Sequence, residues 1–136
     1  MVDALRRAHQ MLQPSGCLVE VHPTAAAASV EVGARTTGGV DAGDAPLRHA
    51  AAGAALTTVV EAGLFAVDRA VDFTFCTYGD TIEELRDYIV ENWTNARIAK
   101  AVVDRTRDAL RDAPGTRPRV REHVRLTTLR PLAPAG

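Results

Sequence analysis

Four polar residues at the ends of strand-like segments are the candidates for chemistry in this sequence: His22, Tyr78, Asp80 and Arg119. Histidine can act as a base or a proton carrier, because its unperturbed pKa is about 6.5. The sequence shows no evident nucleophile or carboxylate partner for His22, so the competing interpretation is that it closes a strand before Pro23. Tyr78 and Asp80 flank a glycine and can equally form only a strand end and a turn. These residues therefore indicate weak candidates for binding a small molecule and no catalytic set.

An arginine-rich segment near the carboxyl end, "RVREHVR", raises the question of nucleic-acid binding. Its polar residues would line one face of a strand: Arg119, Arg121, His123 and Arg125. The whole chain has 16 basic and 17 acidic residues and a net charge of −1, so it has no global positive field. No aromatic side chains alternate with these arginines, as a stacking surface would require. We therefore expect no nucleic-acid partner, and a strand face that is solvated or reaches helix residues such as Glu83, Glu84 and Asp87.

Asp41, Asp44 and His49 have side chains that can bind a metal ion, but their spacing matches no established ligand pattern. Capping of the helix that follows explains Asp44 more simply. We therefore predict no metal site.

The two cysteines, Cys17 and Cys76, lie in strand-like apolar runs without CxxC spacing. They predict free thiols rather than a zinc site or a disulfide framework, which favours a reducing compartment and a cytoplasmic location. No apolar run approaches the roughly 18 residues that a membrane span requires, so no membrane association is expected.

Hydrophobic periodicity predicts an α/β domain with three or four helices. The helices are expected at residues 2–12, from Asp44 to a stop at Gly63, from the capping box "TIEE" at Thr81 onward, and at 98–113. Strands are expected at 17–22, 70–78 and 119–129, and residues 28–43 fit a hairpin or an irregular excursion with a Thr-Thr-Gly-Gly turn. A chain of 136 residues suffices for one core, so we predict one domain over residues 1–130 and a flexible tail at 131–136.

The order of "ALRRAHQMLQPSGCLVEVHP", a long helix, "GLF", a strand, "TYGDTIEELRDYI", a helix and a strand resembles the carboxyl-terminal half of class I S-adenosylmethionine-dependent methyltransferases. The resemblance covers about residues 2–130. It implies a truncated Rossmann-like mixed sheet, in which 17–22, 70–78 and 119–129 are the fifth, sixth and seventh strands. The seventh strand would run antiparallel between the other two.

The family holds its cofactor with a glycine-rich turn after the first strand and an acidic residue that ends the second. Both features would lie upstream of Met1. The glycine-rich stretch of this chain, "EVGARTTGGVDAG", does not follow a strand and open a helix, as a phosphate-binding turn must. We therefore expect no S-adenosylmethionine site in this chain alone.

Under this resemblance, the carboxyl ends of the fifth and sixth strands and the start of the seventh share one edge of the sheet, where open α/β sheets bind ligands. His22, Tyr78, Asp80 and Arg119 would share that rim, and one intervening strand would separate His22 from Tyr78 by roughly 10 Å. The leading expectation is a methyltransferase-like remnant without catalysis that acts as a binding or assembly module. The alternatives are part of a methyltransferase completed by another chain or by upstream sequence, and a small unrelated activity that uses His22 and Tyr78.

The resemblance also predicts assembly. In the family the fifth strand pairs with the fourth, so residues 17–22 would form an apolar edge that must be covered to avoid aggregation. Residues 30–32 could fold back on it, a second copy could pair with it, or a partner chain could supply a strand. Two-fold homodimers are the commonest closed assembly, so we expect a homodimer through this edge or the helix beside it, burying on the order of 1,200 Å² or more.

Overall fold

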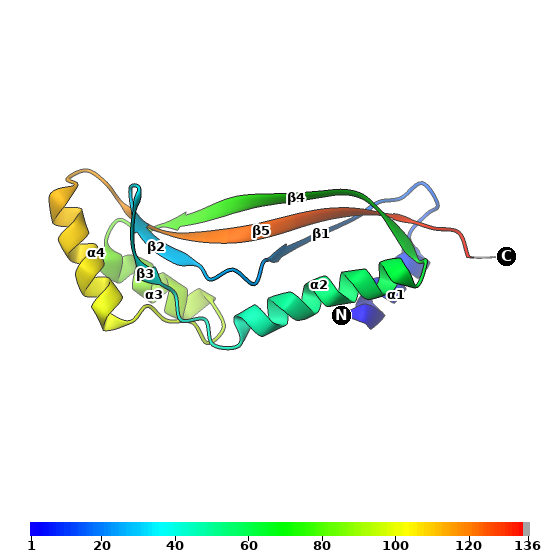
Figure 1. The fold of residues 1–136 in the computed structure, drawn as a ribbon, viewed down its shortest axis with the longest axis horizontal. Helices are drawn as coiled ribbons and strands as arrows, with labels where there is room; N and C mark the ends of the chain where they lie inside the picture. The colour runs from blue at the N-terminus through cyan, green and yellow to red at the C-terminus, as the bar shows by residue number, and fades with distance from the viewer. Residues whose placement is uncertain (135–136) are drawn as a thin grey trace. The chain divides into compact units, whose positions relative to one another are not determined.

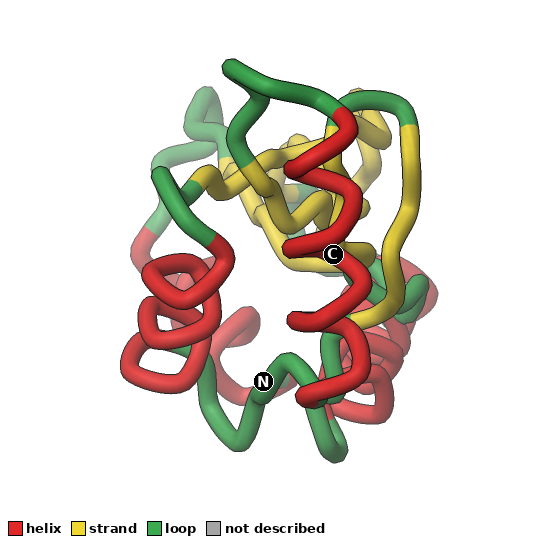
Figure 2. Tube along the Cα trace, turned by 90° about the vertical axis from the view of Figure 1, so that its left-hand side faces the viewer, coloured by secondary structure: helices red, strands yellow, loops and turns green. Residues whose placement is uncertain are grey.

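The structure is a computed structural model that describes residues 1–134 of the chain. Within these residues the elements are α1 (Val2–Met11), β1 (Leu18–Pro23), β2 (Ser29–Val32), β3 (Arg35–Gly39), α2 (Ala45–Glu61), β4 (Phe65–Tyr78), α3 (Ile82–Asn92), α4 (Lys100–Asp112) and β5 (Pro118–Pro131) (Figure 1). Figure 2 shows the same helices and strands by colour from a second direction. The predicted α/β class is confirmed, and all four expected helices are present.

The chain divides into two compact units. Unit 1 contains Met1–Thr24, Leu47–Phe73 and the chain from Val124 onward, and unit 2 contains Ala25–Pro46 and Thr74–His123. Each of the two long strands, β4 and β5, contributes one segment to each unit. The single domain expected over residues 1–130 stays a prediction.

Unit 1 is a three-stranded layer with β5 in the middle. β1 pairs with β5 antiparallel, with Leu18 opposite Leu129. β4 pairs with β5 as well. Its ion pairs from Asp72 to Arg125 and from Asp68 to Arg130 show that these two strands also run antiparallel. Helix α2 runs along this layer (Figure 1), and the helices and strands of the unit enclose one buried cluster: Leu5, Ala55, Leu56, Val59, Phe65 and Leu129.

Unit 2 is built on a β2–β3 hairpin that pairs with the start of β5. Val30 lies opposite Val120 in an antiparallel register. Helix α3 begins where the sequence predicts, because the side chain of Thr81 accepts a hydrogen bond from the backbone N–H of Glu84. Helices α3 and α4 pack with the strands around a second cluster: Val30, Val40, Ile82, Leu85, Ile89, Ala96, Ile98, Val102, Val103 and Val120.

The predicted Thr-Thr-Gly-Gly turn is wrong. The hairpin turns at Gly33, whose φ of 57° suits glycine, and the four residues 36–39 lie inside β3. The glycine at position 38 serves close packing instead, because a Cβ atom there would lie 2.5 Å from a methyl group of Val102 in α4.

The strands agree with the prediction in one pairing and differ in length and sheet type. β5 lies between β1 and β4 and is antiparallel to β1, as predicted for the last strand. β4, however, begins at Phe65 rather than at residue 70. The sheet is antiparallel rather than mixed, because neighbouring strands run antiparallel, including those of the β2–β3 hairpin. The tail predicted from residue 131 starts inside β5, and the N–H of Leu132 donates to the carbonyl of Leu64. Positions 135–136 of that predicted tail lie outside the described residues.

The burial pattern of β5 agrees with the predicted alternation only in its first part. Val120 and Val124 are buried, as expected. Farther along, Thr127 and Leu129 are buried, whereas Leu126 is half-buried. The alternation in the sequence therefore predicts the strand but not which positions its later half buries.

Candidate functional site: a charged cluster and a strand edge

Three of the four predicted site residues meet in unit 2. An Nη atom of Arg119 lies 3.4 Å from the hydroxyl of Tyr78. The guanidinium of Arg117 lies 5.1 Å from the centre of the Tyr78 ring and 3.5 Å from the carboxylate of Asp80. The end of β4 and the start of β5 thus bring Tyr78, Asp80 and Arg119 together with Arg117, a residue that the sequence analysis did not select.

Glu31 in β2 is the centre of this cluster, and it was also missed. Arg119 donates to it from Nε at 3.1 Å and from Nη2 at 3.0 Å, and the Ser29 hydroxyl donates at 2.9 Å. Arg121 Nε lies 3.2 Å from the same carboxylate, whose side chain is 10% exposed. In the sequence, Glu31 is a single carboxylate between Val30 and Val32. Its role becomes evident only once β5 is known to pair with β2.

The environment of Glu31 keeps the carboxylate ionised. Burial alone would raise the pKa of Glu31, but the hydrogen bonds from Ser29 and Arg119 and the charges of Arg121 and Arg119 lower it below its ordinary value. The hydrogen bond with Tyr78, followed by that with Glu31, raises the pKa of Arg119. A carboxylate held in this way is a weak base, so the cluster suits charge pairing better than proton transfer.

The partners of the arginines in β5 differ from the expected ones. Arg119 and Arg121 face Glu31 of β2, and Arg125 pairs with Asp72 of β4 at 2.7 Å. Glu83, one of the helix residues expected to receive them, pairs with Arg107 of α4. The arginines therefore link neighbouring strands rather than reaching from strand to helix.

His22 belongs to unit 1 and has partners of its own. Its Nδ1 atom lies 2.7 Å from one carboxylate oxygen of Glu20 and 2.8 Å from the other. The side chains are 13% and 12% exposed, respectively. Glu20 is the carboxylate partner that the sequence analysis did not find. The rim that would unite His22 with Tyr78, Asp80 and Arg119 stays a prediction.

The residues considered for a metal site have other partners. Asp41 pairs with Arg97 at 3.0 Å. His49, in α2, has a lowered pKa because burial disfavours its charged form; a hydrogen bond with the backbone of Thr24 opposes this, and the charges of Arg48 and His22 add to it. In the part of the chain that the structure describes, no group of three or more histidine, cysteine or acidic residues could hold a metal ion.

The glycine-rich segment does not fit the cofactor grip that the methyltransferase resemblance implies. Gly33 closes a β-hairpin, and Gly38 and Gly39 lie within β3. A phosphate-binding turn leads from a strand directly into a helix, whose N-terminus holds the anion. This segment leads from β2 into β3 and then, through residues 40–43, into α2, contrary to the expectation that it follows no strand and opens no helix. Its strands form an antiparallel hairpin rather than a βαβ unit, so it does not match the cofactor turn of the family.

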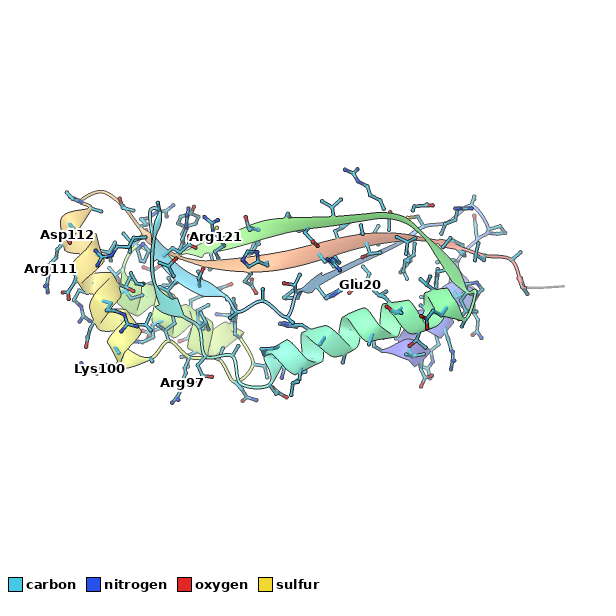
Figure 3. All side chains as sticks on the ribbon, in the orientation of Figure 1. Glu20, Arg97, Lys100, Arg111, Asp112 and Arg121 are labelled. Carbon is cyan, nitrogen blue, oxygen red and sulfur yellow. The ribbon has the colours of Figure 1, made fainter. Side chains whose placement is uncertain are left out.

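A second feature is the outer edge of β1. This strand ends the order β1–β5–β2–β3, so among the described strands it pairs with β5 alone. Glu20 lies between β1 and α2 (Figure 3). Val19 and Val21 alternate with it along the strand, so they lie on the other face, and they are 56% and 53% exposed. Just before the strand, Cys17 is an exposed free thiol, as Cys76 in β4 is a half-buried one.

No family model, curated protein or solved structure matches this chain. Its resemblance to methyltransferases therefore rests on the order of its segments. None of the helices among residues 1–134 is long and apolar enough to cross a membrane.

Proposed function

We propose that this chain is a non-catalytic assembly module with the architecture of the carboxyl-terminal half of a class I methyltransferase, and that it forms a homodimer through the outer edge of β1. The order of its elements supports the architecture, since α1 precedes β1, α3 and α4 connect β4 to β5, and α2 lies between β1 and β4 after the inserted β2–β3 hairpin. The position of β5, antiparallel to both β1 and β4, is the position that the resemblance implies for the seventh strand.

The observation that carries the proposal is the outer edge of β1, which pairs with no other described strand. Natural sheets blunt their edges with short strands, charges or prolines. β3 is short and contains two glycines, and β4 carries Asp68, Arg69 and Asp72. The single acidic residue of β1, Glu20, turns toward α2 and leaves Val19 and Val21 on the open face. The outer edge of β1 therefore carries exposed apolar side chains and can accept another strand.

Sedimentation equilibrium tests the proposal directly. The wild-type chain should be a dimer at micromolar concentration, and Val21→Lys should dissociate it, because a charge on the open face blocks strand pairing. The matched control is Val67→Lys in β4, which changes a residue that is 49% exposed in the same unit and should leave the dimer intact. A wild-type monomer at high micromolar concentration, or equal effects of the two substitutions, would contradict the proposal.

The second candidate function is a methyltransferase completed by another polypeptide. The same observation favours it, because the resemblance places the family's fourth strand along this edge of β1. Titration calorimetry with S-adenosylmethionine separates the candidates. We expect no binding by the dimer, whereas tight binding by this chain, or binding that appears only with a partner chain, would favour the second candidate.

A further inference from the structure

We infer that the second copy pairs with β1 in one antiparallel register, with Val21 opposite Val21 and Glu20 opposite His22 of the second copy. This inference rests on the proposed function, since it specifies the arrangement of the same edge. The occupant of the edge is therefore another copy of the chain, and the sequence of β1 itself selects how it pairs.

Strand geometry limits the registers that a two-fold dimer can adopt. Alternate residues of a strand direct their backbone N–H and C=O groups to opposite edges. The residues of both copies that form hydrogen bonds across the new edge are therefore either all odd-numbered or all even-numbered. The two-fold axis must then pass through one residue of β1, which lies opposite itself. Only registers centred on a single residue remain, and each sets different side chains opposite each other.

Charge complementarity distinguishes these registers. Centring on Glu20 sets two carboxylates opposite each other, and centring on His22 sets two imidazoles opposite each other. Like groups directly opposite are unfavourable, whereas opposite charges stabilise a cross-strand pair. Centring on Val21 is the register that sets each Glu20 opposite a His22. Two carboxylates and two imidazoles then alternate around a four-membered group. Within each strand Glu20 contacts His22 at the observed 2.7 Å, and between the strands each Glu20 lies opposite the His22 of the other copy.

The open face of the edge agrees with the same register. Val21 is 53% exposed and would pack on Val21 of the second copy, which removes both side chains from water. Val19 would lie opposite Pro23, which continues the apolar contact. Because residues of one strand alternate between faces, the valines and the Glu20–His22 pairs use opposite faces of the extended sheet.

A charge-swapped variant tests the register. Glu20→His combined with His22→Glu keeps a carboxylate beside an imidazole within each strand, and its homodimer restores both cross-strand pairs. A mixed dimer with the wild-type chain would set Glu20 opposite the new glutamate, and His22 opposite the new histidine. Because the swapped chain has the same mass as the wild-type chain, one of the two is labelled with ¹⁵N. Native mass spectrometry of the equilibrated mixture should then show the mixed dimer at roughly one-third of its statistical share. A statistical share would overturn the register, and an enriched mixed dimer would indicate centring on residue 20 or residue 22 instead.

Disulfide cross-linking keeps the inference testable if the swapped variant does not fold. In a background with Cys17→Ser and Cys76→Ser, Val21→Cys places two cysteines directly opposite each other, with Cα atoms about 4.5–5.5 Å apart. Mild oxidation should give a covalent dimer for Val21→Cys and none for Val19→Cys. A dimer that cross-links through position 19 rather than 21 would overturn the register and leave the proposed function standing. A chain that sediments as a monomer would overturn the proposed function itself.

Discussion

The carboxylate of Glu20 lies 2.7 Å from Nδ1 of His22, two residues farther along the same strand. Residues two apart in a strand share a face, and here that face is covered by α2, where the Nε2 atom of His22 lies close to Gly53. The pair is therefore part of how β1 packs against α2. It also gives His22 a structural role beside any role in binding.

Replacement of His22 by Ala should lower stability by about 1–3 kcal/mol, because it leaves the mostly buried carboxylate of Glu20 without its hydrogen-bond donor. This expectation differs from the sequence interpretation of His22 as a ligand-binding residue, which would leave the melting temperature nearly unchanged. Thermal unfolding with His123→Ala as the control measures the difference, since His123 is an exposed histidine of β5. Equal melting temperatures for the two variants would contradict a structural role for His22.

Replacement of Glu31 by Gln should cost about 3 kcal/mol, because two arginines would then face each other without the carboxylate that pairs with both. Urea unfolding measures the loss. The control is Glu83→Gln, which breaks a half-exposed ion pair with Arg107 and should cost at most about 1 kcal/mol. Similar losses in the two variants would show that Glu31 is not the centre of the cluster.

The stability of the wild-type chain should also fall in acid through Glu31. The pKa of Glu31 is lowered in the folded state, so the carboxylate contributes stability that is fully present above its ordinary value of 4.5. That contribution is lost as the pH falls through the lowered folded pKa. The stability difference between the wild-type chain and Glu31→Gln should therefore shrink below pH 4.5, and a constant difference would contradict the assignment.

Glu122 should have the opposite effect on the pH dependence of stability. Burial raises the pKa of Glu122, so the folded protein binds a proton there more tightly than the unfolded chain does. The ionised form therefore destabilises the fold at neutral pH, and this effect disappears as the pH falls below the ordinary value of 4.5. Glu122→Gln should raise the melting temperature at pH 7 and have little effect in acid. A lower melting temperature at pH 7 would indicate that the carboxylate makes a favourable contact.

Gly38→Ala should destabilise the chain by about 1–3 kcal/mol, because the new methyl group would overlap Val102 in α4. The double variant with Val102→Ala should recover part of the loss, since the smaller side chain makes room. The matched control is Gly39→Ala, where the nearest atom would lie 3.7 Å away in ordinary contact. Denaturant unfolding of the wild-type chain, Gly38→Ala, Val102→Ala and the double variant gives the coupling, and additive effects of the two changes would rule out direct contact.

Local patterns in the sequence determined the elements. The capping box at Thr81 set the start of α3, and apolar periodicity placed all four helices and the segments of β1, β4 and β5. These signals act between residues a few positions apart, so no knowledge of the fold is needed to use them. The position of the turn in the glycine-rich hairpin was harder to predict. A glycine required by a turn cannot be distinguished in the sequence from a glycine required by close packing, and only the contact of α4 with Gly38 shows which applies.

Only the tertiary structure decided which side chains meet. Glu31 and Arg119 are 88 positions apart, and nothing local to either of them indicates the other. Pairing of β2 with the start of β5 brings them into contact, and the same pairing sets Arg121 beside the carboxylate. The separation of His22 from Tyr78 into different units likewise follows from contacts along the whole chain. Burial, and with it the pKa of Glu31 and Glu122, arises from this packing, because the cost of desolvating a charge depends on every element around it.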